Sequence, residues 1–313
     1  MATIVAPLEH SAAEDAQAIR EAVKGWGTDK DALISILAHR YYHQRNEIRK
    51  AYQHLYEEDL IRRLESELKG SFEGAIYRWI PEPADRDALL ANIALRKGKF
   101  NHRVIVEVSC ARHPEEFLAA KRAYFLHYRH SMEEDVASHT TGALRKLMVA
   151  LVGVYRYDGD EIDEELAVSE AETLHYFIEE NAFGHDEIIR IVSTRSKKQL
   201  LATINRYKDN HGTSITKTLA RIADNVVADA LYAAIGCLTD QTKYYEKVLR
   251  NALHNRTDED ALTRVIVTQA ERYLWHIKDL YYRRNSERLE EAVAKETRGH
   301  YEDFLLALLG NHN

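Results

Sequence analysis

The residues with the clearest potential for chemistry are those at 25–29, where two glycines flank a tryptophan in Gly25-Trp26-Gly27-Thr28-Asp29. Glycine tolerates positive φ, so successive backbone carbonyls in this stretch can turn toward one point. Carbonyl oxygens are hard ligands that suit Ca²⁺, which takes oxygen donors at about 2.3–2.6 Å and favours a bidentate carboxylate. The loop itself lacks that carboxylate, so the acid must come from elsewhere in the chain.

A glutamate far from the loop in sequence is the best candidate for the acid. Glu67 lies 40 residues after Gly27 and three residues before a glycine. Near the end of the chain, the same spacing separates Arg256 from Glu296, which again lies three residues before a glycine. A spacing that occurs twice at the scale of a repeat predicts a site assembled from two loops on one side of the molecule.

Helices are expected to position these two loops. Ser11 begins an S-x-x-E capping box, and apolar residues at helical spacing follow it. Thr28 is the expected N-cap of a second helix that runs to Arg40. The next three helices are expected at 47–56, 59–68 and 72–80. Because no segment of comparable length alternates apolar and polar residues, we predict an all-α fold.

This helical pattern recurs four times along the chain. An apolar helical segment that ends in arginine or glutamine marks each unit, at Arg40, Arg112, Arg195 and Gln269. The markers are 72, 83 and 74 residues apart, so four repeats of five helices each fill the chain. We expect an N-terminal tail at 1–10, repeats at 11–82, 83–154, 166–238 and 242–313, and a polar linker at 155–165.

Charge and composition exclude several classes of protein. The net charge of −7 argues against nucleic-acid binding, and against direct adsorption to an acidic membrane unless a cation intervenes. The longest apolar run, at 147–154, is far shorter than the roughly 20 residues of a membrane-spanning helix. Two cysteines, Cys110 and Cys237, are too few for a disulfide framework and favour the cytosol. Buried, unreactive thiols are expected, with a redox pair as the alternative.

Together, the glycine loop, its distant acid and the repeated helix ends resemble the annexin family, and plant annexins in particular. The resemblance covers residues 14–311. It implies a curved disc of four five-helix repeats, with calcium loops between the first two helices of a repeat, on the convex face. It also implies calcium-dependent binding of a cytoplasmic protein to acidic phospholipid membranes. The implied calcium ligands in repeat 1 are the carbonyls of Val23, Gly25 and Gly27 and the carboxylate of Glu67.

The other three repeats depart from this pattern. Repeat 2 has Lys97-Gly98-Lys99-Phe100-Asn101 as its loop and His139 in place of the acid, so we expect no site there. Repeat 3 lacks the two-glycine spacing at 181–186, and its site is also expected to be lost. Repeat 4 keeps Glu296, but His254 and Arg256 stand where the glycines would be. A β-carbon disfavours left-handed geometry by about 1 kcal/mol or more, so any calcium site in repeat 4 is expected to be degenerate.

Several alternatives remain open at this level. Trp26 is expected to contact the membrane interface rather than the core. The triplet at 189–191 resembles one linked to actin binding in the family, although an arginine between apolar helix residues is ordinary packing. The alternative function is therefore a calcium-independent helical-repeat scaffold for protein partners or actin. We expect a monomer or weak self-association and no enzyme active site, with an oxidative-stress enzyme as the third hypothesis.

Overall fold

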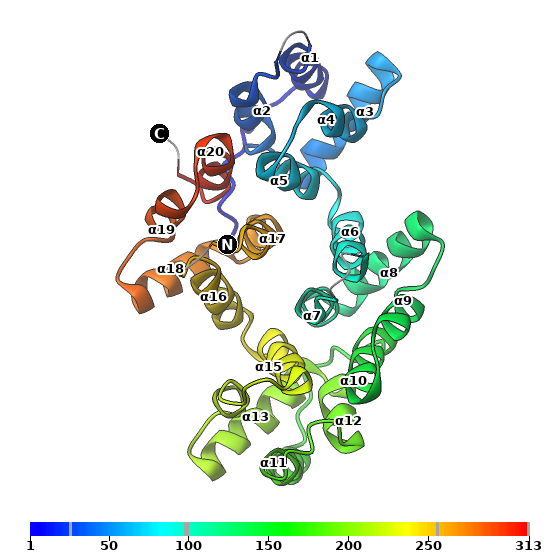
Figure 1. Ribbon diagram of the computed structural model, residues 1–313, viewed down its shortest axis with the longest axis vertical. Helices are drawn as coiled ribbons and strands as arrows, with labels where there is room; N and C mark the ends of the chain where they lie inside the picture. Colours follow the sequence, from blue (N-terminus) through cyan, green and yellow to red (C-terminus); the bar gives the residue numbers. More distant parts are fainter. Residues whose placement is uncertain (25–26, 97–99, 255–256, 312–313) are drawn as a thin grey trace. The chain divides into compact units, whose positions relative to one another are not determined.

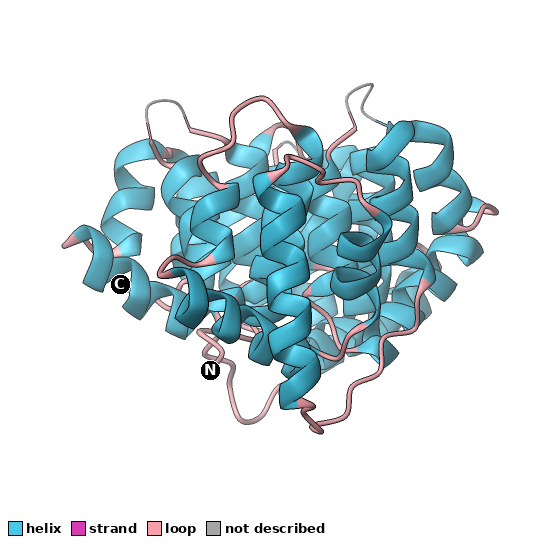
Figure 2. Ribbon diagram, turned by 90° about the horizontal axis from the view of Figure 1, so that it is seen from below, coloured by secondary structure: helices cyan, strands magenta, loops and turns pink. Residues whose placement is uncertain are grey.

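The structure is a computed structural model that describes residues 1–24, 27–96, 100–254 and 257–311. Within these residues every regular element is a helix, as Figures 1 and 2 show, so the all-α prediction is confirmed. The chain forms two compact units, 1–86 with 245–313 and 87–244. No helix in the described part of the chain combines the length and apolar character that crossing a bilayer requires.

Among the described residues, each repeat contributes five helices in the order expected from the sequence. Repeat 1 contains α1 (Ala12–Ala22), α2 (Lys30–Leu37), α3 (Tyr42–Tyr56), α4 (Leu60–Glu67) and α5 (Ser71–Trp79). Repeat 2 contains α6 (Pro83–Arg96), α7 (His102–Cys110), α8 (Pro114–Tyr128), α9 (Met132–His139) and α10 (Gly142–Gly153). Repeat 3 contains α11 (Glu164–Glu179), α12 (Asp186–Thr194), α13 (Lys197–His211), α14 (Ile215–Leu219) and α15 (Val226–Thr239). Repeat 4 contains α16 (Gln241–Ala252), α17 (Glu259–Gln269), α18 (Leu274–Asn285), α19 (Leu289–Glu296) and α20 (Gly299–Leu308).

The helix ends of repeat 1 follow their caps and differ in places from the prediction. Ser11 caps α1 as expected, through a hydrogen bond from the Glu14 backbone N–H. Asp29, rather than Thr28, caps α2, because its carboxylate accepts the Ala32 backbone N–H at 2.9 Å. Helix α2 ends at Leu37, three residues before the expected Arg40, and α3 begins at Tyr42 instead of residue 47.

The recurring arginine that marks the repeats has a structural partner. In the first three repeats its guanidinium forms an ion pair with a carboxylate 25 residues earlier, on the first helix of the same repeat. The pairs are Asp15–Arg40 at 2.7 Å, Asp87–Arg112 at 2.5 Å and Glu170–Arg195 at 2.6 Å. In repeat 4 the corresponding positions are Tyr244 and Gln269. The marker therefore ties the first helix of a repeat to the end of its second helix, and repeat 4 replaces the ion pair with uncharged residues.

Repeats 1 and 4 share the core of one unit, in which α17 and α20 pack against α5 (Figure 1). Arg45 is fully buried there, 3.6 Å from the ring centre of Trp79 and 3.1 Å from the carboxylate of Glu271. Arg86 forms a second ion pair with Glu271 at 3.6 Å. Burial lowers the pKa of Arg45 to about 10, which leaves it charged at neutral pH. One carboxylate from repeat 4 thus neutralises two arginines of the shared core.

Candidate metal centre

The connection between α1 and α2 is the first half of the candidate site. Helix α1 ends at Ala22, whose carbonyl accepts the Asp29 backbone N–H at 2.8 Å and so closes the loop. Gly27 has a φ of +89°, in the left-handed region that the sequence predicted for the loop glycines. Gly25 and Trp26 lie outside the described residues, so the predicted carbonyl ligand and the predicted membrane contact remain predictions.

The turn between α4 and α5 is the second half. Glu67 is the last residue of α4, and Leu68 after it is extended. Gly70 has a φ of +83°, and the corresponding glycines at the first position of α10 and of α20 also have a positive φ. Residues with a side chain rarely adopt a positive φ. The glycine three residues after Glu67 therefore allows the chain to turn directly from the acid into the next helix.

Arg63 brings the two halves together. Its Nη2 atom donates to the Val23 carbonyl at 2.9 Å, and the same atom lies 3.0 Å from Oε1 of Glu67. The Val23 carbonyl and the Glu67 carboxylate, from segments far apart in the sequence, therefore converge on one positively charged nitrogen. Arg63 was not among the site residues predicted from the sequence, although its position one helical turn before Glu67 was a signal that the two side chains would pair.

The donor set fits a hard cation. Val23 offers a neutral carbonyl oxygen and Glu67 a carboxylate, which are the ligand types that Ca²⁺ prefers. Both side chains at the α4 end are only about one-quarter exposed, at 27% for Arg63 and 27% for Glu67. The same oxygens already contact a positive group in this structure, so their arrangement is compatible with a cation between the two segments.

Repeat 4 has a different arrangement around its acid. The Thr257 hydroxyl donates to Oε2 of Glu296 at 2.9 Å, so a loop and its acid meet here too. The Asp258 backbone N–H, however, donates at 2.8 Å to the carbonyl of Ala252, the residue that corresponds to the predicted ligand Val23 of repeat 1. Glu296 and His254 line one cleft of about 440 Å³. Arg256 lies outside the described residues, so its predicted place in a degenerate site stays a prediction.

In repeats 2 and 3 the corresponding residues have other contacts. His139 of repeat 2 hydrogen-bonds through Nδ1 to the Asp135 carbonyl at 2.7 Å, and residues 97–99 of its loop lie outside the described part of the chain. In repeat 3 the loop residue Phe183 is buried, and the ring of His185 stacks on Phe177 at a centroid distance of 3.6 Å. The predicted absence of calcium sites in these repeats is compatible with these contacts but stays a prediction.

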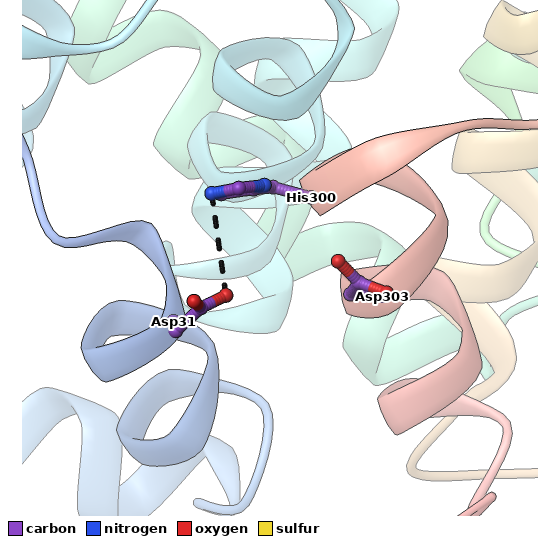
Figure 3. Close-up of side chains that lie close together, drawn as sticks. All are labelled: Asp31, His300 and Asp303. Atoms are coloured by element: carbon purple, nitrogen blue, oxygen red, sulfur yellow. Dashed lines mark ion pairs between the residues drawn. The ribbon is translucent and has the colours of Figure 1, made fainter.

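A surface cluster elsewhere in the first unit does not support a metal assignment. Figure 3 shows Asp31 of α2 facing His300 of α20, with Asp303 nearby on the same helix. The closest approach between the first two is 4.0 Å, and all three side chains are exposed. His300 also rests edge-on against Phe72. Exposed acidic groups are common without a metal, and no fourth histidine, cysteine or acidic residue joins this group among the described residues.

The two cysteines and the triplet at 189–191, which resembles one linked to actin binding, were the other candidate functional residues. Cys110 and Cys237 are both buried and free, and burial raises the pKa of each thiol. Both are therefore protonated at neutral pH, as expected for unreactive thiols. Arg190 of the triplet at 189–191 forms ion pairs with Glu170 at 3.1 Å and with Glu187 at 2.9 Å. These pairs give the arginine a structural role within repeat 3.

The chain is similar to known proteins over its whole length. The Annexin family model matches residues 14–79, 86–151, 169–234 and 244–308, in agreement with the four predicted repeats. The annexin-like protein RJ4 of Fragaria ananassa is 59% identical over 314 residues, which is 100% of each chain. The structure of annexin III has a TM-score of 0.91 at 30% identity and covers 100% of this chain and 98% of its own. A calcium-bound structure of annexin (Sm)1 has a TM-score of 0.83 at 26% identity and covers 99% and 93%.

Proposed function

Because this chain belongs to the annexin family, as a plant-type member, we propose that it binds acidic phospholipid membranes when calcium rises, through its repeat 1 site. Annexins generally bind calcium and phospholipid. The proposal for this chain is that Val23, Gly25 and Gly27 supply carbonyl ligands and that Glu67 supplies the carboxylate. Acidic phospholipid is the partner, and Trp26 contacts the membrane interface.

The single observation that carries this proposal is the convergence of the Val23 carbonyl and Glu67 on one cationic atom. Two oxygens from distant segments lie close enough to share a positive partner, which is the first requirement of a metal site assembled from two loops. A calcium ion bound here would keep free coordination positions, and lipid phosphate oxygens could fill them. This also explains how a chain with a net charge of −7 can approach an acidic surface.

The affinity of such a site for calcium alone should be low. A site of carbonyls and one carboxylate is expected to have a dissociation constant on the order of 10⁻⁵–10⁻³ M. Lipid oxygens complete the coordination shell, so the apparent affinity should rise with the acidic lipid content of the membrane. With one intact site, the gain from multivalent binding is limited. The protein should therefore need more calcium than a relative with two intact sites.

Co-sedimentation with vesicles tests the proposal. The full chain is mixed with phosphatidylserine/phosphatidylcholine vesicles across a calcium series, and with phosphatidylcholine vesicles alone. We expect binding only with calcium and acidic lipid, and loss of binding at moderate calcium in Glu67→Gln. The matched control is Glu65→Gln, because Glu65 is exposed on the same helix two residues away. Binding in Glu67→Gln that equals that of Glu65→Gln would refute the assignment to repeat 1.

The same assay separates the alternative functions. A calcium-independent scaffold for protein partners or actin predicts that the chain stays on its partner in excess chelator. The cytoplasmic location and monomeric or weakly associating state remain part of the proposal. None of the similar proteins named above carries the name of an enzyme. We propose no catalytic role, and peroxide turnover by the metal-free protein without haem would contradict that part of the proposal.

A further inference from the structure

A single guanidinium contacts both described ligands of the repeat 1 site. Nη2 of Arg63 donates to the Val23 carbonyl at 2.9 Å and lies 3.0 Å from Oε1 of Glu67. Nε of Arg63 is buried and has no hydrogen-bond partner among the described residues. The guanidinium is therefore held against these two oxygens instead of extending into solvent, where all of its N–H groups would be hydrated.

Calcium and this guanidinium need the same lone pairs. A calcium ion bound in bidentate fashion by Glu67 requires both carboxylate oxygens at about 2.3–2.6 Å, together with the Val23 carbonyl. A guanidinium bonded to these groups places a second positive charge within a few ångströms of the ion, where partial exclusion of water strengthens the repulsion. Arg63 and calcium therefore cannot both keep these contacts.

Building on the calcium site proposed above, we propose that Arg63 is a built-in competitor of calcium that sets the calcium concentration at which this chain binds membranes. Calcium binds when the guanidinium leaves Val23 and Glu67. While Arg63 stays in place, it neutralises the acid and blocks the carbonyl. The competition raises the calcium requirement above the one that the ligands alone would give.

A second carboxylate lies within reach of the displaced guanidinium. Nη1 of Arg63 is 4.0 Å from Oε1 of Glu58. The other oxygen of Glu58 accepts from Arg20 at 2.5 Å, so Oε1 has capacity for a further donor. A side-chain rotation toward Glu58 would release both calcium ligands and keep the guanidinium paired. The exchange needs no change in the backbone of α4.

The competitor is a property of repeat 1. Arg63 precedes Glu67 by four residues, whereas Ala292 stands four residues before Glu296 in repeat 4. An alanine cannot neutralise the acid, and there Thr257 contacts Glu296 through a neutral hydroxyl. Arg63 is therefore not a general requirement for ending this helix at an acid, and its removal should leave α4 intact.

Calcium titration of the full chain by calorimetry, without lipid, tests the proposal in three variants. Arg63→Gln removes the competitor. Arg62→Gln is the matched control, because it removes the same charge from an exposed side chain of the same helix. We expect Arg63→Gln to bind calcium about three- to tenfold more tightly than wild type, from the loss of two charge-assisted contacts at a partly exposed site. Arg62→Gln should match wild type, and Glu67→Gln should lose the binding.

Vesicle binding distinguishes a competitor from a purely structural arginine, because the two roles predict opposite changes in the calcium requirement of Arg63→Gln. Loss of a positive charge weakens attraction to an acidic membrane, so a structural or electrostatic role predicts that Arg63→Gln needs more calcium. The competitor role predicts that it needs less. Circular dichroism in chelator checks the fold, and Arg63→Met, which keeps the aliphatic part of the side chain, replaces Arg63→Gln if that variant unfolds.

The outcomes separate this inference from the proposed function. If Arg63→Gln binds calcium no more tightly than Arg62→Gln while Glu67→Gln loses binding, the competitor role is wrong and the calcium site stands. If Glu67→Gln binds calcium like wild type, the site itself is wrong. Tighter binding in Arg63→Gln that disappears in the double variant with Glu67→Gln is the result that the proposal predicts.

Discussion

Repeats 1 and 4 lie in the same compact unit and present the same kind of helix end, but their acids have different partners. Glu67 and Glu296 each end a helix and are each followed by a glycine with positive φ. Glu67 is paired with the cationic Arg63, whereas Glu296 accepts a hydrogen bond from the neutral Thr257. The helix end is therefore shared, and the side chains around it decide what the acid can bind.

The loop closures of the two repeats differ as well. In repeat 1 the closing backbone hydrogen bond runs from Asp29 to Ala22, which leaves the next carbonyl, that of Val23, to Arg63. In repeat 4 the bond runs from Asp258 to Ala252, and Ala252 occupies the position that corresponds to Val23. The same spacing between loop and acid thus leaves a carbonyl for a cation in repeat 1 and uses it within the backbone in repeat 4.

The largest expected effect concerns the core that both repeats share. In Glu271→Gln the buried charge of Arg45 loses its counter-ion, and Arg86 loses the same partner. Because an uncompensated buried charge is strongly unfavourable, we expect the free energy of unfolding to fall by about 3 kcal/mol. Urea unfolding followed by circular dichroism measures this, with the exposed Glu65→Gln as the control. A loss below about 0.5 kcal/mol would show that the two repeats do not depend on this ion pair.

The next effect separates the two acids. We expect Glu67→Gln to raise the calcium concentration for half-maximal vesicle binding by at least about tenfold, as for the loss of a metal-site group. Glu296→Gln should change it by less than about twofold, because repeat 4 offers a poorer set of ligands. Both substitutions remove one negative charge, so each controls for the other. Equal shifts in the two variants would contradict the difference drawn between the repeats.

A smaller effect is expected from repair of repeat 4. Arg256→Gly restores the glycine that corresponds to Gly27, and Arg256→Gln removes only the positive charge. If backbone geometry limits the site, Arg256→Gly should lower the calcium requirement for vesicle binding by about fivefold, which corresponds to the cost of about 1 kcal/mol for a left-handed residue with a side chain. Arg256→Gln should then lower the calcium requirement by a smaller factor. An equal fall in the calcium requirement of both variants would show that the positive charge, and not the backbone geometry, weakens calcium binding by repeat 4.

The smallest effect concerns the start of the helix that carries Arg63 and Glu67. Asp59 caps α4, whereas Arg288 at the start of α19 makes no side-chain cap. Burial alone would raise the pKa of Asp59, but the Arg49 guanidinium and the Arg62 backbone N–H lower it below its ordinary value. A depressed folded-state pKa stabilises the fold above the unfolded value of about 4 and loses this contribution as the pH falls through the folded value.

Asp59→Asn therefore tests the cap through pH. The asparagine still accepts a hydrogen bond but loses the charge, so we expect a loss of about 0.5 kcal/mol at pH 7. The difference between variant and wild type should shrink as the pH falls below about 4, where the wild-type carboxylate becomes protonated. Urea unfolding at pH 7 and at acidic pH measures it. A difference that does not depend on pH would assign the effect to shape instead of charge.

Much of the fold, and one half of the site, could be predicted from the sequence. Helical periodicity and the repeated arginine were sufficient for the repeats, and the spacing from the glycine loop selected Glu67, which the structure places beside Arg63 together with the Val23 carbonyl. The partners of these residues could not be predicted, because they depend on contacts between distant segments. Glu271 pairs with Arg45 across 226 residues, and Arg63 donates to Val23 across 40. Neither pairing leaves a periodic signal in the chain.

Helix ends were also less certain than the helices themselves. Thr28 and Asp29 are both good capping residues, and only the geometry of the loop selects Asp29. Helix α3 begins five residues before its predicted start because the Gln44 side chain accepts the Tyr41 backbone N–H and supports an earlier first turn. The local sequence allowed several starts, and the capping hydrogen bonds that form in the folded chain chose among them.

The most direct test is an anomalous-scattering map of a crystal at saturating calcium. The account predicts a peak between the Val23 carbonyl and Glu67 in repeat 1, with Arg63 turned toward Glu58, and a weaker peak or none beside Glu296. Absence of a peak in repeat 1, with Arg63 still bonded to both Val23 and Glu67, would contradict the account.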